Sequence, residues 1–164
     1  GFLLTTTIES TAYRAIQGVA NARSLLEAGF TTIRDLGNAG LYADALRVIE
    51  RAPRQDLPDE EAAQWLYVKA NCERQLMSHA AAVATYREIL KQYAKTRYAA
   101  SSGYELALVH YRAGEHDKAI KDYTEAIRLD PNDAWAYNNR SAVYSMKGDE
   151  QKAKTDFEKY ESLR

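Results

Sequence analysis

The sequence contains an internal repeat, and this repeat limits what the chain can fold into. Ala119 recurs 34 residues later as Ala153, and a shift of 37 residues carries it back to Ala82 and then to Ala45. A period of this length is typical of stacked supersecondary units, each of which buries its apolar face against its neighbours. The sequence therefore predicts a repeat array rather than a domain with one central core.

Each unit reads as a pair of helices. Apolar residues follow helical spacing around residues 106–111 and again over residues 119–129, and Gly114 marks a turn between these segments. Pro131 should end the second helix, because the residue before a proline disfavours helical backbone, and Asp133 can cap the next helix. The small residues Ala107 and Ala119 stand where the two helices would cross closely. The predicted fold class is all-α, a solenoid of helix-turn-helix units.

These units resemble the tetratricopeptide repeat. The residues that carry the resemblance are Ala107, Gly114, Ala119, Tyr123, Ala126 and Pro131, followed one period later by Ser141, Gly148, Ala153 and Phe157. An earlier unit matches at Ala70, Ala82 and Tyr86, with Met77 where glycine is usual in the turn. The resemblance covers residues 40–164, which divide into a repeat remnant (40–58) and three repeats (59–96, 97–131 and 132–164).

The last unit has a polar residue at a position that is apolar in the others. Lys154 stands where the earlier units carry Leu46, Val83 and Ile120. In inner repeats this position should pack on the next unit, and terminal repeats need an outer face that water can wet. We therefore expect that no further repeat follows.

Residues 1–39 do not continue the repeat. Their pattern predicts a helix over about residues 9–28 and an extended or irregular segment over 30–36, which tertiary context could recruit into helix. The run over residues 20–37 resembles a fragment of the metal-dependent amidohydrolases. The first metal-binding His-x-His of that family would lie upstream of Gly1, and the remaining ligands would fall where this chain has repeats. The resemblance therefore implies no metal and no hydrolase activity.

Three interpretations of this front segment stay open. In the first, the chain is a chimera: an engineered fusion, a recombinant fragment or a gene-fusion remnant. In the second, it is a fragment of an amidohydrolase, which the missing metal ligands disfavour. Alternatively, the segment serves as a cap or an oligomerisation patch, because apolar residues such as Ile16, Val19 and Leu26 must be buried somewhere. That third interpretation allows a homo-oligomer formed through the N-terminal segment.

The composition of the chain argues against some kinds of binding partner. The formal net charge of −1 argues against nucleic acid and membrane surfaces, because binding phosphates requires clustered lysine and arginine. No apolar run is long enough to span a bilayer. The single cysteine, Cys72, excludes an internal disulfide framework and fits a reducing compartment, so we expect a cytoplasmic protein.

The sequence offers no catalytic, metal or cofactor site. His79 and His116 share a position with Tyr42, so we expect them to pack on the first turn of each second helix rather than to bind metal. His110 and Cys72 are expected to be packed structural residues. The mixed charges between residues 117 and 130 are expected to form a solvated face. Phosphate-binding glycine loops are lacking.

The resemblance implies instead a binding groove, because in this family the first helix of each pair lines the concave face of the superhelix. By helical spacing, the inward residues would be Tyr67, Asn71, Arg74, Tyr104, Leu108, Tyr111, Arg112, Trp135, Asn138, Asn139 and Ala142. Aromatic, asparagine and arginine side chains together suit an extended peptide.

A subset of the family grips the C-terminal tails of heat-shock chaperones with a carboxylate clamp. Asn71 fits one clamp position, but Glu105, Trp135 and Asn139 depart from the others. We therefore do not expect this chain to bind chaperone tails. The sequence predicts a non-enzymatic scaffold that binds a protein or peptide ligand.

Overall fold

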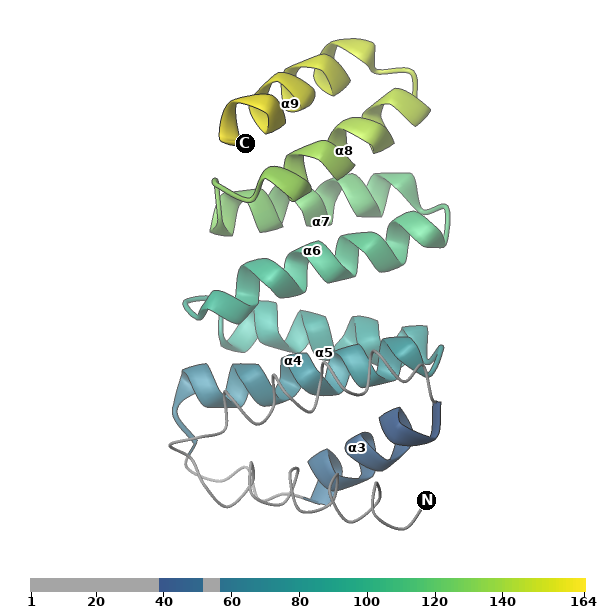
Figure 1. Ribbon diagram of the computed structural model, residues 1–164, viewed down its shortest axis with the longest axis vertical. Helices are drawn as coiled ribbons and strands as arrows, with labels where there is room; N and C mark the ends of the chain where they lie inside the picture. The colour runs from purple at the N-terminus through teal and green to yellow at the C-terminus, as the bar shows by residue number, and fades with distance from the viewer. Residues whose placement is uncertain (1–38, 52–56) are drawn as a thin grey trace.

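The computed structural model describes residues 39–51 and 57–164, and within them the chain forms helices and no strand. The helices are α3 (Ala39–Arg51), α4 (Asp59–Gln75), α5 (His79–Gln92), α6 (Arg97–Arg112), α7 (His116–Leu129), α8 (Ala134–Met146) and α9 (Glu150–Leu163). Figure 1 shows them stacked in chain order, with α3 toward one end and α9 at the other. This arrangement is the expected α-helical solenoid. The helix expected at 9–28 and the extended segment at 30–36 lie outside the described residues.

The core is divided among the repeats. One buried cluster joins α3 to α4, a second joins α4, α5 and α6, and a third joins α6, α7 and α8. Tyr86 and Tyr123, the largest side chains in the second and third clusters, are fully buried. Because each cluster includes the first helix of the following unit, every repeat is stabilised by its neighbour.

Close helix crossings depend on small residues. Ala107 and Ala119 are both fully buried in the third cluster, as the sequence predicted. A Cβ atom on Gly103 of α6 would lie 3.2 Å from Cβ of Ala126 on α7. A larger side chain at position 103 would push these two helices apart.

The turns inside the repeats require left-handed backbone. Gly114 and Gly148 have φ values of 74° and 78°, and Met77 has a φ of 61° at the equivalent position of the α4–α5 repeat. Glycine adopts this conformation freely, whereas a side chain with a Cβ atom is strained there. The α4–α5 repeat therefore contains a strained turn that the other two avoid.

A buried polar contact joins the two helices of each repeat at a recurring position. In the α4–α5 repeat the Thr85 hydroxyl donates a hydrogen bond to Glu73 Oε2 at 2.7 Å. In the α6–α7 repeat, 37 residues later, His110 Nδ1 lies 2.5 Å from Asp122 Oδ2. Buried polar groups need partners, and the repeat period determines where these partners meet.

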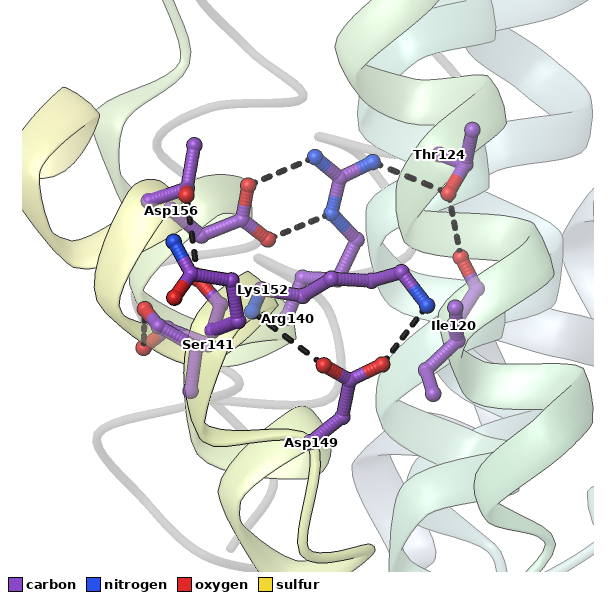
Figure 2. Close-up of polar contacts among 10 residues, drawn as sticks. Ile120, Thr124, Arg140, Ser141, Asp149, Lys152 and Asp156 are labelled. Atoms are coloured by element: carbon purple, nitrogen blue, oxygen red, sulfur yellow. Dashed lines mark hydrogen bonds and ion pairs between the residues drawn. The ribbon is translucent and has the colours of Figure 1, made fainter.

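In the α8–α9 repeat Asp156 holds the position of Thr85 and Asp122, but its partner is an arginine that lies about one turn before the position of Glu73 and His110. Arg140 Nε and Nη2 donate to the two carboxylate oxygens of Asp156, each at 2.7 Å, and Nη1 donates to Thr124 Oγ1 at 2.9 Å. Figure 2 shows the guanidinium of Arg140 between Asp156 on α9 and Thr124 on α7. This bidentate charge-assisted contact joins the last two helices and ties them to the preceding repeat.

The start of α8 and the histidines at the starts of α5 and α7 differ in how well they match the sequence-based predictions. Asp133 caps α8 by accepting a hydrogen bond from the backbone N–H of Ala136, which confirms its predicted role. The packing expected for His79 is wrong, because its side chain is exposed. His116 is half-buried beside the Tyr111 ring, at 6.3 Å between centroids. In the α4–α5 repeat the residue equivalent to Tyr111 is Arg74, a flexible side chain that pairs with Glu105 on α6.

Candidate interaction surface

The first helices of the three repeats, α4, α6 and α8, carry the residues expected to bind a partner. On α4 these are Tyr67, Asn71 and Arg74, whose spacing of four and then three residues places them along one face of the helix. Contacts between neighbouring helices show which of the expected residues come together. We call the set of expected residues on α4, α6 and α8 the first-helix surface.

Asn71 lies beneath this surface rather than on it. Its side chain is 2% exposed. Its Oδ1 accepts hydrogen bonds from the Tyr86 hydroxyl at 3.1 Å and from Arg74 Nη2 at 3.2 Å, while Nδ2 donates to the backbone carbonyl of Tyr67 at 2.9 Å. Because both ends of its amide bond inside the protein, Asn71 helps to position the Arg74 guanidinium and the Tyr86 hydroxyl.

An ion pair joins α4 to α6. Arg74 Nε lies 3.4 Å from Glu105 Oε2, and both side chains are largely buried. Burial raises the pKa of Glu105 above its usual range, although Arg74 and Arg112 both act to lower it. Burial, with a contribution from Glu105, also raises the pKa of Tyr67 to about 12, so its phenol stays protonated. On the first-helix surface, the Glu105 carboxylate is thus acted on by the charges of two arginines, Arg74 and Arg112.

The sequence contains a signal for Glu105 besides its departure from the carboxylate clamp. Glu105 and Asn139 are 34 residues apart, so they occupy the same position in successive repeats. Asn139 belongs to the expected binding set, and the repeat period alone would have added Glu105. Its pairing with Arg74 depends on the spacing of α4 and α6.

A hydrogen bond joins α6 to α8. Asn139 Nδ2 donates to the Tyr104 hydroxyl at 2.8 Å across 35 residues of sequence. The Tyr104 ring also packs against the ring of Tyr123, with 5.9 Å between centroids and an edge-on orientation. The pairs at Arg74 and Tyr104 therefore connect the three first helices into one surface.

The remaining residues differ in access to solvent. Trp135 is 62% exposed and Arg112 is exposed, whereas Leu108, Tyr111 and Asn138 are half-buried. Exposed aromatic and arginine side chains are the types most often found at the energetic centre of protein interfaces. The accessible part of the surface therefore lies on α6 and α8.

Comparison with protein families identifies the repeat. A model described as a TPR repeat matches residues 107–148, and a model described as a tetratricopeptide repeat matches residues 30–96. The chain belongs to the tetratricopeptide repeat family. The second match starts ten residues before the array expected from residue 40, and the resemblance of residues 1–39 to amidohydrolases stays a sequence-based prediction.

Solved structures share this tetratricopeptide architecture. MamA is 25% identical with a TM-score of 0.70, and the alignment covers 95% of this chain and 85% of MamA. BtubC from P. vanneervenii is 19% identical with a TM-score of 0.72, covering 98% of this chain and 70% of BtubC, which shows the fold alone.

A curated relative is the photosystem I assembly protein Ycf3 of Cyanophora paradoxa, which is 29% identical over 86 residues. The match covers 52% of this chain and 50% of Ycf3, so it spans about half the length of that relative. Tetratricopeptide repeat proteins mediate protein–protein interaction and assembly, and these scaffolds are generally non-enzymatic.

Other candidate sites are structural in the described part of the chain. Cys72 is fully buried, and burial raises the pKa of its thiol to about 12, so it is an unreactive core residue. His110 is 4% exposed and held by Asp122, so this aspartate belongs to the interior rather than to the expected solvated face. Residues 39–51 and 57–164 contain no cluster suited to a metal ion and no helix long and apolar enough to cross a membrane.

Proposed function

We propose that the first-helix surface of α4, α6 and α8 binds an extended segment of a partner protein. The observation that carries this proposal is the run of contacts from Arg74 through Glu105 to Tyr104 and Asn139, beside an exposed Trp135. A surface held in place before binding loses less side-chain entropy when the partner arrives.

The chemistry of the accessible residues supports a peptide ligand. Rings such as Trp135 and Tyr104 offer contact area with few rotatable bonds, which limits the entropy cost of binding. Arg112 forms no ion pair within residues 39–51 and 57–164, although its charge acts to lower the pKa of Glu105, so its guanidinium can meet a carboxylate or a backbone carbonyl of a partner. Asn138, half-buried on α8, can pair with a peptide backbone.

We infer a cytoplasmic location from the single buried cysteine. Cys72 lies in the core of α4 as a free thiol, and it needs no oxidising compartment for stability. The proposed partner is accordingly an intracellular protein or peptide.

The test uses fluorescein-labelled peptides from a random library, with binding measured by fluorescence anisotropy on the whole chain. We expect Trp135→Ala and Arg112→Ala each to weaken a binding peptide by about tenfold. Tyr104→Ala should weaken it as well, and circular dichroism checks that this half-buried position still folds.

Arg128→Ala is the matched control. Arg128 is exposed on α7 and, among the described residues, pairs only with Glu125 on the same helix, so its loss should leave peptide affinity unchanged. If Trp135→Ala, Arg112→Ala and Tyr104→Ala all leave every peptide interaction unchanged, the first-helix surface is not the binding site.

A further inference from the structure

Helix α9 has an outer face with no neighbour in the described chain. Figure 1 shows α9 at one end of the stack, beside α8. Phe157 on α9 is 49% exposed, whereas Tyr86 and Tyr123, its equivalents in the inner repeats, are fully buried. An inner repeat covers this position with the first helix of the next unit, so Phe157 occupies a position that is normally an interface.

A single stripe of residues runs along this face. The residues are Glu150, Lys154, Phe157, Glu161 and Arg164, spaced by four, three, four and three residues, and all of them are exposed. At 3.6 residues per turn this spacing keeps the first four on one side of α9, and Arg164 is the residue that directly follows the helix. In order, the stripe reads acidic, basic, aromatic, acidic, basic.

The charges of the stripe are complementary to those of a second copy that runs in the opposite direction. If a second α9 lies antiparallel across the first with Phe157 at the centre, Glu150 faces Arg164 of the second copy and Lys154 faces Glu161. Every charge meets an opposite charge, and the two Phe157 rings meet each other. A two-fold dimer requires such a patch, because both copies present the same surface.

We propose that the outer face of α9 is a docking surface for a second copy of this chain, paired antiparallel about Phe157. The aromatic centre is broader than Phe157 alone. Its ring lies 5.8 Å from that of Tyr160, which lies 6.0 Å from that of Trp135. An aromatic centre with a charged rim is the usual anatomy of a reversible protein interface.

The charged side chains of the stripe can give up their present partners for those of a second copy. Lys154 pairs with Glu158 at 3.9 Å within α9, and Arg164, the residue after α9, pairs with Glu161 at 3.7 Å; all four side chains are well exposed. Exposed ion pairs of this kind contribute little, so contacts with the second copy can replace them.

The same residues disfavour a stacked repeat helix as the occupant. In the inner repeats the position of Lys154 is held by Val83 and Ile120, which pack against the apolar clusters. A lysine there would leave its charge in an apolar interface. A charged, self-complementary partner such as a second α9 avoids that cost.

The test is sedimentation velocity of the full 164-residue chain over a concentration series, at low and high salt. We expect a monomer–dimer equilibrium that weakens with salt. Phe157→Ser and Lys154→Glu should each raise the dimer dissociation constant by about tenfold or more. The double variant Lys154→Glu/Glu161→Lys should restore the dimer, because the exchanged charges again face opposite charges.

Lys159→Glu is the matched control, since it makes the same charge change at an exposed position on the other side of α9. It should leave the dimer intact, and circular dichroism checks that each variant folds. The proposal is overturned if the chain is monomeric at all concentrations. It is equally overturned by a dimer that resists Phe157→Ser and Lys154→Glu, which would locate self-association elsewhere, such as the N-terminal segment.

Discussion

The α4–α5 and α8–α9 repeats have the same helical framework but different internal contacts. In α4–α5, buried Glu73 accepts a hydrogen bond from a neutral hydroxyl, that of Thr85, and lies 3.4 Å from Lys69. In α8–α9, Asp156 forms two short contacts with Arg140. The position on the second helix is thus kept, whereas its partner on the first helix changes in both chemistry and place, since Arg140 lies about one turn before the residue equivalent to Glu73.

The two repeats also differ in their surroundings. The α4–α5 repeat has neighbours on both sides and shares its apolar core with α6. The α9 helix contributes only Ala153 and Asp156 as buried residues, and Phe157 is half-exposed. All three repeats use a polar contact between their helices, but α9 adds less apolar packing to it than the second helices of the inner repeats do.

The largest expected effect is in the α8–α9 repeat. Arg140→Ala should destabilise the fold by about 3 kcal/mol, because it leaves the Asp156 carboxylate buried without a partner. Urea denaturation followed by circular dichroism measures this change. Arg140→Met/Asp156→Leu should recover most of the loss by removing both charges, and a double variant as unstable as Arg140→Ala would contradict this account.

A smaller effect is expected where α4 meets α6. Arg74→Ala should cost about 2 kcal/mol at pH 7, since Glu105 loses its nearest cation. The folded-state pKa of Glu105 lies above its ordinary value of 4.5, so the folded chain binds an extra proton between the two values. Lowering the pH toward 4.5 should therefore stabilise the fold and reduce the loss in unfolding free energy that Arg74→Ala causes.

Urea denaturation at pH 7 and at pH 5 measures this difference. The control is Glu105→Gln/Arg74→Ala, in which no carboxyl remains at position 105 and the pH-dependent part of the deficit should disappear. A deficit that is equal at both pH values in Arg74→Ala would show that Glu105 does not cause it.

The smallest effect is in the turn of the α4–α5 repeat. Met77→Gly should stabilise the chain by about 0.5–1 kcal/mol, because it relieves a left-handed residue whose side chain is 73% exposed. Gly114→Ala should destabilise by about 1 kcal/mol at the equivalent turn. Thermal unfolding compares the two variants, and effects of the same sign would contradict the argument from φ.

The helices and turns of the described repeats follow from the sequence. The 34- and 37-residue period, together with helical spacing, places α6 and α7 on either side of Gly114, and Asp133 and Pro131 mark the boundary before α8. These features depend on local chemistry, such as backbone freedom at glycine and the capping carboxylate. His79 shows the limit, because its repeat position predicts packing and the side chain is exposed.

The proposed binding residues could be predicted only as a set of helix positions. Helical spacing assigns Asn71 and Trp135 to one face, yet Asn71 is fully engaged in the interior and Trp135 is exposed. This difference comes in part from the Tyr86 hydroxyl on α5, which reaches Asn71 only after α4 and α5 pack, whereas Arg74 contacts Asn71 within α4 itself. A repeat period cannot supply such distances.

The sequence by itself determined the repeat, its all-helical class and the positions of its turns, because these depend on residues close together along the chain. Tertiary structure alone decided that Glu105 pairs with Arg74, that Arg140 connects Asp156 to Thr124, and that Phe157 is left uncovered. These contacts join separate helices, and their geometry depends on how far apart neighbouring repeats pack.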